Sequence, residues 1–301
     1  MKKLITPILG LLAAANSASA VTVLLNDQFT DGERLTQSLT SSARWTVGAQ
    51  RPSNPIGTGN AANGSLVVGH RSINGDNSFV ATWAHFTASG TPTTIAVGER
   101  LELSFTLALT GTGDFSGSAS AFRFGLFNSG GSRVTNDFVN TGTPGIESGA
   151  TFTGWRGYTA ETPATTALNG QVFRIRERIA TNPVQPGLFS GGAYATVPNT
   201  VPGTDTENVF AFNTPYNAQL SLERTLTGIT ITSRIGTSSI IQVTDTTLPV
   251  VAFDTVAFFA VEGLSYDLSF DNVKVELIPE PSGAVLAALS AGMLLFRRRR
   301  A

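Results

Sequence analysis

The sequence predicts an all-β protein in which two antiparallel sheets pack face to face, and three observations indicate it. With 31 glycines, 19 phenylalanines and only 14% charged residues, the composition fits strands joined by polar turns better than helices. Several apolar runs repeat with a period of two, as half-buried strands do. No convincing amphipathic helix occurs outside the two ends. Because the chain of 301 residues has no cysteine, core burial must stabilise it.

The clearest strand covers residues 101–110, where leucines and Phe105 alternate with polar or small residues. Such alternation predicts one buried and one solvated face. Less regular runs occur at 65–69, 79–86, 121–127, 172–179, 218–225, 228–235, 256–261 and 266–277. Nine or more strands favour two packed sheets. The stretches 128–170 and 182–207 look irregular, and no composition shift marks a boundary, so residues 21–278 are expected to form one domain.

The N-terminus has the three parts of a secretory signal peptide. Lys2 and Lys3 precede an apolar run over residues 4–15, and Ala18-Ser19-Ala20 supplies a small-residue cleavage site. We therefore expect export by the Sec machinery, with signal peptidase removing residues 1–20. The alternative is a retained membrane helix, for which the run is short.

The C-terminus combines Pro279-Glu280-Pro281 with an uncharged apolar segment over residues 283–296 and an arginine tail. Fourteen helical residues cover only about 21 Å, so this short transmembrane helix is a marginal anchor for a hydrocarbon core of about 30 Å. Basic residues hold a chain end on the cytoplasmic side, which places the preceding domain outside the inner membrane. The tail consists of Arg297, Arg298, Arg299 and Arg300.

This order of Pro-Glu-Pro, short helix and basic tail resembles the PEP-CTERM sorting signal of Gram-negative bacteria. The resemblance covers residues 279–301 and implies that an exosortase recognises Pro279, Glu280 and Pro281 and removes the segment behind them. It also implies a final place at the cell surface or in the extracellular matrix, often together with exopolysaccharide and biofilm formation. The alternative is a plain tail anchor with an accidental tripeptide.

The two ends of the expected domain, residues 25–33 and 267–275, resemble the terminal strands of concanavalin-like or galactose-binding-like jelly rolls. The resemblance implies a jelly-roll-like sandwich whose first and last strands are neighbours. It also favours carbohydrate as a ligand.

Charge and histidine content exclude several classes of function. Between residues 21 and 278 there are 14 basic and 20 acidic residues, with Lys274 as the single lysine, so the basic surface needed for nucleic acid is missing. Both histidines, His70 and His85, lie outside any catalytic motif, and each is expected to be a strand residue with a hydrogen-bonded ring. Two isolated histidines without cysteine do not make a zinc site.

A glycoside hydrolase needs two carboxylates around the scissile bond. The nearest candidates are Asp267 and Asp271, two aspartates of one run, and one member of the usual acidic triplet is missing. We therefore expect a non-enzymatic protein. The alternatives are a polysaccharide-active hydrolase or lyase, or a purely structural surface module that binds other proteins.

The last run also changes phase. Leu268 and Phe270 occupy even positions and Val273 and Val275 odd ones, which predicts a β-bulge at Asp271 and Asn272. Their oxygens, with Asn26 and Asp27 on a neighbouring first strand, could hold a structural Ca²⁺. The alternative is a polar bulge that satisfies its own backbone. No other cofactor is expected.

Planar aromatic rings beside polar groups suit the binding of sugars. Trp155, Arg156 and Tyr158, in a Gly-rich stretch, form the best such cluster, with an aromatic loop folded over the sandwich edge as the alternative. Trp45 and Trp83 are expected in the core.

Alternation places Arg174, Arg176 and Arg178 on one sheet face. The three guanidinium groups could bind an anionic ligand such as a uronate or sulfate polymer. Alternatively, they pair across strands with acids such as Glu223 or Glu102.

Overall fold

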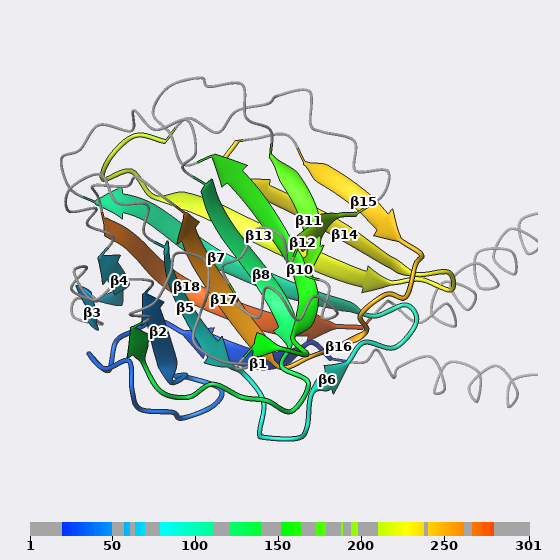
Figure 1. Ribbon diagram of the computed structural model, residues 1–301, viewed down its shortest axis with the longest axis horizontal. Helices are drawn as coiled ribbons and strands as arrows, with labels where there is room; N and C mark the ends of the chain where they lie inside the picture. The colour runs from blue at the N-terminus through cyan, green and yellow to red at the C-terminus, as the bar shows by residue number, and fades with distance from the viewer. Residues whose placement is uncertain are drawn as a thin grey trace, which may run out of the picture.

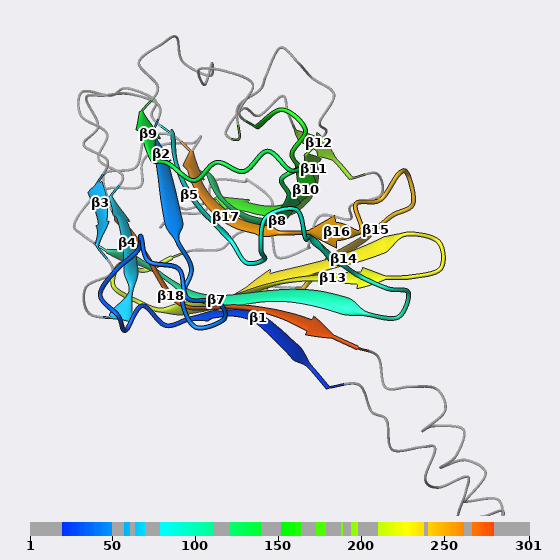
Figure 2. The same ribbon diagram turned by 90° about the horizontal axis from the view of Figure 1, so that it is seen from below.

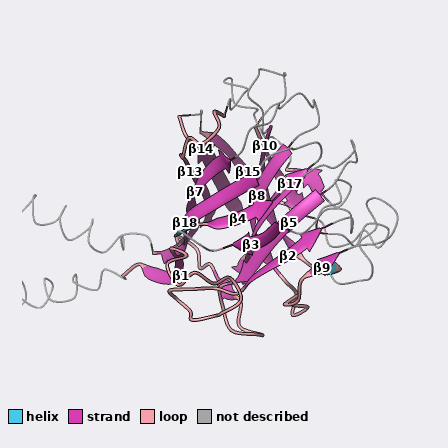
Figure 3. Cartoon of the chain, turned by 90° about the vertical axis from the view of Figure 1, so that its left-hand side faces the viewer, coloured by secondary structure: helices cyan, strands magenta, loops and turns pink. Residues whose placement is uncertain are grey.

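Two sheets of eight strands each make up the computed structural model, in which they overlap in the view of Figure 1 and lie face to face as two layers in Figure 2. The structure describes residues 20–49, 57–60, 64–69, 79–110, 121–139, 152–163, 173–178, 188, 194–197, 210–237, 240–261 and 267–279. Strands supply nearly all the regular structure of these residues (Figure 3). The predicted all-β sandwich of jelly-roll type is therefore confirmed.

The first sheet is antiparallel and is built around its longest strand, β18 (Asp267–Ile278). Along one side β18 pairs with β7 (Arg100–Thr110), and along the other with β1 (Thr22–Asp27) and β4 (Leu66–Gly69) in succession. Beyond β7 follow β13 (Tyr216–Arg224), β14 (Ile229–Ile235) and β15 (Ile241–Asp245). Beyond β4 follows β3 (Gly57–Asn60).

The second sheet has β8 (Ala121–Asn128) near its centre. On one side lie β10 (Arg156–Pro163), β11 (Arg174–Arg178) and β12 (Tyr194–Thr196). On the other side lie β17 (Thr255–Val261), β5 (Phe79–His85) and β2 (Trp45–Ala49), followed by β9 (Phe138–Val139), which runs parallel to β2. A two-stranded ribbon joins β16 (Ala252–Phe253) to β6 (Thr93–Thr94).

Aromatic rings join the two sheets in the core. Phe258 of β17 stacks on Phe270 of β18 with ring centroids 4.3 Å apart, and Phe105 of β7 lies 4.7 Å from Phe258. Trp45 stacks on Phe258 from the neighbouring part of the second sheet. Period-two alternation turns these side chains inward, so one continuous apolar core fills the space between the sheets.

A second apolar cluster covers the outer face of the second sheet. Phe259 follows the core residue Phe258 along β17 and therefore points the other way. It packs there with Trp83 and Phe127 from neighbouring strands and with Phe152 and Trp155 from the segment before β10. Part of the outer face of the second sheet is thus buried under apolar side chains and shielded from solvent.

The terminal strands β1 and β18 are antiparallel neighbours, with Thr22 opposite Leu277, and both chain ends leave at the same end of the sandwich (Figure 2). This confirms the prediction that the first and last strands are adjacent. It also explains where the sandwich stops: β18 ends at Ile278, directly before Pro279, and proline has no N–H for a strand ladder.

The structure corrects the prediction that residues 128–170 and 182–207 are irregular. β10 lies inside the first stretch and β12 inside the second. β15 was also missed. β10 is hard to recognise because Gly157 and alternating small residues interrupt its apolar pattern, although it pairs on both sides.

Candidate ligand-binding face

The structure corrects the proposed sugar-stacking role of Trp155 and Tyr158. Both rings are fully buried. Trp155 Nε1 donates to the Ser132 carbonyl at 2.8 Å, and the Tyr158 hydroxyl donates to Asp245 at 2.6 Å. Burial and this bond to Asp245 raise the pKa of Tyr158 well above its usual range. A ring without exposed surface cannot stack on a sugar, so these residues hold the sandwich together instead.

Arg156, the third residue of that predicted cluster, remains partly exposed. Its Nη2 donates to Glu177 and to the Leu248 carbonyl, both at 2.9 Å. Together with Asn128, its partner on β8, it lines a shallow pocket of about 280 Å³, whose other side is the segment from Pro249 to Ala252. The structure therefore leaves one polar residue of the three in contact with solvent.

The four residues predicted to hold Ca²⁺ do not converge. Asp27 points into the core, where its carboxylate accepts hydrogen bonds from the backbone N–H groups of Phe29 and Ala43 and from Trp45 Nε1, at 2.9 to 3.0 Å. Burial raises its pKa, although these three donors oppose the shift. Asn26, the neighbouring residue, alternates to the opposite face.

The bulge itself is confirmed at Asp271 and Asn272. The register between β18 and β7 shifts between Asp271 and Lys274, and Asn272 has a φ of 52°. Both Asp271 oxygens accept hydrogen bonds from Asn272, one from its backbone N–H at 2.6 Å and one from its side chain at 2.9 Å. The bulge thus satisfies its own polar groups. Among the described residues, no group of three or more His, Asp or Glu side chains could hold a metal ion.

A cluster of arginines lies on the outer face of the second sheet, around the carboxylate of Glu161. Arg123 Nε donates to it at 2.6 Å, Arg174 Nε at 2.9 Å and Arg176 Nη1 at 3.2 Å. Arg123 and Arg174 stand directly opposite Glu161 on the two flanking strands. The predicted partners Glu223 and Glu102 are wrong, because they lie in the first sheet.

Tyr194 completes this cluster, which we name the arginine face: Arg123, Arg174, Arg176, Arg178, Glu161 and Tyr194. The guanidinium groups of Arg123, Arg176 and Arg178 lie 5.5 to 5.9 Å from the Tyr194 ring centroid, within cation–π range. Four positive charges and one negative charge give the face a formal charge of +3. The sequence predicts three of these arginines on one face, whereas Glu161 and Tyr194 lie in the stretches predicted to be irregular.

Electrostatics keep Glu161 ionised. Burial alone would raise its pKa, but the charges of Arg123 and Arg174 outweigh burial and lower it. Arg123 is nearly buried, whereas the side chain of Arg174 is 46% exposed. The face is therefore a pre-organised set of guanidinium groups with an inner carboxylate and an open outer arginine.

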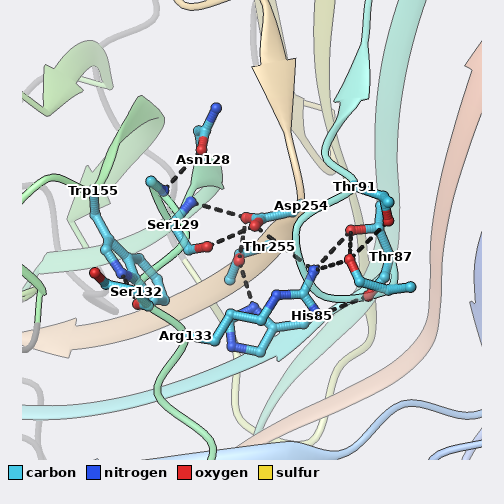
Figure 4. A network of polar contacts seen from close by, with 12 residues as sticks. His85, Thr87, Thr91, Asn128, Ser129, Ser132, Arg133, Trp155, Asp254 and Thr255 are labelled. Atoms are coloured by element: carbon cyan, nitrogen blue, oxygen red, sulfur yellow. Dashed lines mark hydrogen bonds and ion pairs between the residues drawn. The ribbon is translucent and has the colours of Figure 1, made fainter.

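A buried polar network joins β5, β17 and the segment after β8 (Figure 4). Asp254 accepts hydrogen bonds from the N–H and hydroxyl of Ser129 and from the Thr255 hydroxyl, at 2.6 to 2.9 Å. His85 Nδ1 lies 2.7 Å from the Thr255 hydroxyl, and its Nε2 lies 3.2 Å from the Val134 carbonyl. The expected hydrogen-bonded ring of His85 is confirmed.

This network differs from a nucleophile–base pair. Its imidazole contacts Thr255 rather than Ser129, and Ser129 has no exposed surface, so a substrate could not reach the serine hydroxyl. The network instead fixes the segment 129–134 over the second sheet, where Arg133 also donates to the Thr87 carbonyl at 2.8 Å. The other histidine, His70, lies outside the described residues.

Residues 1–19 of the expected signal peptide and most of the C-terminal signal, including Glu280, Pro281 and the arginine tail Arg297 to Arg300, also lie outside the described residues. Pro279 is the last residue described. Across the described ranges, we find no helix with the length and apolar character needed to cross a membrane.

Comparisons with known proteins add little beyond general shape. No protein-family model matches the chain, and no curated protein is significantly similar to it. Three of the similar solved structures are a Bacillus subtilis protein of unknown function with a galectin-like fold, the potassium-bound carbohydrate recognition domain of Emp46p, and an endo-1,3-beta-glucanase from Streptomyces sioyaensis.

All three structures are distant from this chain. In that order, sequence identities are 14%, 13% and 13% and TM-scores 0.42, 0.45 and 0.47. The matches cover 79%, 78% and 87% of this chain and 90%, 88% and 98% of the other chain. Similarities this weak carry no argument about a ligand or an activity.

Proposed function

We propose that this chain is a non-enzymatic exported protein of the bacterial cell surface or extracellular matrix, whose sandwich binds an acidic polysaccharide. The arginine face carries the proposal. Guanidinium groups bind carboxylates and sulfates with directed, charge-assisted hydrogen bonds. On this face Arg174 is the arginine most open to solvent and Arg176 is partly exposed, while Arg123 and Arg178 are buried behind them and add positive charge in a domain that is otherwise acidic. Uronate or sulfate groups along a polymer are therefore the ligand chemistry that fits it.

The spacing of acids on β18 supports a protein without glycosidase activity. Asp267 and Asp271 are four residues apart on one strand, which corresponds to about 13 Å between their backbones. Glycosidases hold their two carboxyl groups about 5 to 9.5 Å apart. Opposite them on β7 stand Thr110 and Thr106, which supply no further acid.

The export route completes the proposal. Residues 1–20 direct the chain to the Sec machinery and signal peptidase, and residues 283–300 hold it in the inner membrane with the sandwich in the periplasm. An exosortase then recognises Pro279-Glu280-Pro281 and transfers the sandwich to its final place. In support, the tripeptide follows β18 without a linker, so the sandwich is complete where the motif begins.

The test is affinity electrophoresis of the secreted protein in gels that contain polygalacturonate, with neutral dextran gels as the reference. Retardation by polygalacturonate should weaken in Arg174→Ala, because one charge-assisted contact of about 1.5–3 kcal/mol is lost, or roughly 10- to 150-fold in affinity. Glu161 keeps Arg123 and Arg176 in this variant. The matched control is Arg234→Ala, an exposed arginine of β14.

Binding should also weaken with added salt, because contacts between exposed charges are screened. Equal retardation of the Arg174 and Arg234 variants, or equal mobility in both kinds of gel, would remove the arginine face as the binding site.

A further inference from the structure

One end of the first sheet collects both chain ends and three connections. The register places Thr22 opposite Leu277, Ile278 opposite Arg100, and Arg100 opposite Glu223. These paired residues form a row across the sheet. The row continues from the end of β13 to the first residue of β14 and then to Asp245, the last residue of β15. The connections before β7, between β13 and β14, and after β15 therefore project beyond this row, beside the points where the chain enters and leaves the sandwich. We name this end the tether end.

Large apolar side chains stand exposed at the tether end. Leu226, in the connection between β13 and β14, is 90% exposed, and Leu248, after β15, is 77% exposed. Val97, before β7, is 52% exposed, and Val21 lies at the entry of β1. Scattered apolar residues are normal on protein surfaces, but four of the seven large apolar side chains exposed among the described residues project from this one end.

The two leucines sit on ordered supports. Thr225 Oγ1 accepts hydrogen bonds from the N–H groups of Thr227 and Gly228, which fixes the turn that carries Leu226. Leu248 has a φ of 59°, a backbone conformation that is unfavourable for a leucine. Its carbonyl is held by Arg156 at 2.9 Å. Both side chains are thus presented outward by a fixed backbone.

The sequence places an apolar anchor close to this end. Only residues 279–282 separate the end of β18 from the segment 283–296, and four residues span at most about 14 Å. Neighbouring strands are about 4.8 Å apart, so the turn with Leu226 lies about 12 Å and Leu248 about 19 Å from β18 across the sheet. Any bilayer that holds the anchor therefore lies within about 14 Å of the end of β18, and both leucines project from that same end of the sheet.

We propose that, while the chain is anchored, its tether end lies on the periplasmic surface of the inner membrane, with Leu226 and Leu248 in the lipid interface. This inference rests on the anchor that the proposed function assigns to the C-terminal segment. Contact with the membrane orients the sandwich and holds the Pro279 junction at the bilayer surface. The partner of this surface is lipid.

The test uses the absence of cysteine in the chain. Leu226→Cys and Ile240→Cys, each carrying the environment-sensitive fluorophore NBD, are prepared in the chain that begins at Val21 and keeps its C-terminal segment. Both chains are reconstituted into vesicles of phosphatidylethanolamine and phosphatidylglycerol with spin-labelled lipids. Ile240 is the matched control, because it is 60% exposed but precedes β15 and so lies at the opposite end.

Interfacial side chains lie within about 5–10 Å of the acyl boundary, so NBD at position 226 should lose roughly half of its fluorescence to the lipid quencher, while NBD at position 240 keeps it. Co-flotation of the chain with the vesicles reports the anchor separately. A chain that floats with equal fluorescence at the two positions overturns the membrane contact alone. A chain that does not float overturns the anchor and the contact together.

Discussion

At the scale of single residues, hydrogen bonds between distant segments fix the buried aromatic side chains Trp155 and Tyr158. Trp155 and Tyr158 looked like a surface platform because glycines surround them, yet each finds its hydrogen-bond partner 23 or 87 residues away. Such partners are set by the packing of distant strands, which no local pattern reveals. The alternating arginines were recognisable, but the acid that they share, Glu161, sits on a strand that was missed.

His85 makes stability depend on pH. Burial, reinforced by the charge of Arg133, lowers its pKa from 6.5 to about 4, although Asp254 and the Val134 carbonyl oppose the shift. Between pH 6.5 and 4, His85 therefore binds a proton in the unfolded chain but not in the folded chain, so the free energy of unfolding falls as the pH falls. At 1.36 kcal/mol per pKa unit, the titration of His85 lowers the free energy of unfolding by about 3 kcal/mol in total as the pH falls from above 6.5 to below 4.

Urea unfolding measured from pH 7 to pH 4 checks this prediction. His85→Gln should lose this share of the pH dependence and keep the share that comes from carboxylates. An identical slope in wild type and variant between pH 6.5 and 5 would show that His85 does not titrate differently on folding.

At the scale of elements, strands with regular alternation were predicted to within a few residues, as for β7, β8, β14 and β17. The bulge in β18 was also predicted, because an apolar pattern that changes phase within one strand keeps both halves facing the core only if an extra residue is inserted. β10 was not predicted as a strand, because its side chains suit the contacts with the neighbouring strands β8 and β11 and do not follow a regular apolar alternation. Glycines there allow β8 and β10 to approach closely.

Gly157 of β10 should be essential for that approach. A Cβ at this position would lie 2.2 Å from the Leu126 carbonyl oxygen and 2.8 Å from Phe127 Cα, both backbone atoms. Gly157→Ala should therefore destabilise the protein by about 1–3 kcal/mol or more, measured as a lower midpoint of denaturant unfolding. Thr244→Ala, at an exposed position of β15, should stay within about 0.5 kcal/mol of wild type. Equal midpoints for the two variants would contradict the close approach of β8 and β10.

At the scale of the whole molecule, the sequence predicted two packed sheets and adjacent terminal strands. The order of strands within each sheet could not be predicted from the sequence, because that order depends on pairings between segments up to about 250 residues apart. The position of the arginine face on the outer side of the second sheet, away from β1 and β18, follows from the same pairings.

Processing tests the expected route. Replacing Pro279, Glu280 and Pro281 by alanines should leave export intact, because the N-terminal signal is unchanged, but should stop the removal of the C-terminal segment. Immunoblots of cell fractions should then show the longer form in the inner membrane. A variant of unchanged size and location would reduce the C-terminal segment to a simple anchor.

The central claim is that the sandwich binds an acidic polysaccharide without cleaving it. One measurement tests it directly: the secreted protein is incubated with polygalacturonate, and bound polymer is quantified in the same sample as newly formed reducing ends and unsaturated products. We predict salt-sensitive binding with no increase in either product over hours. New reducing ends or unsaturated products that disappear in Asp267→Asn or Asp271→Asn would contradict the claim, and so would the absence of bound polymer at low salt.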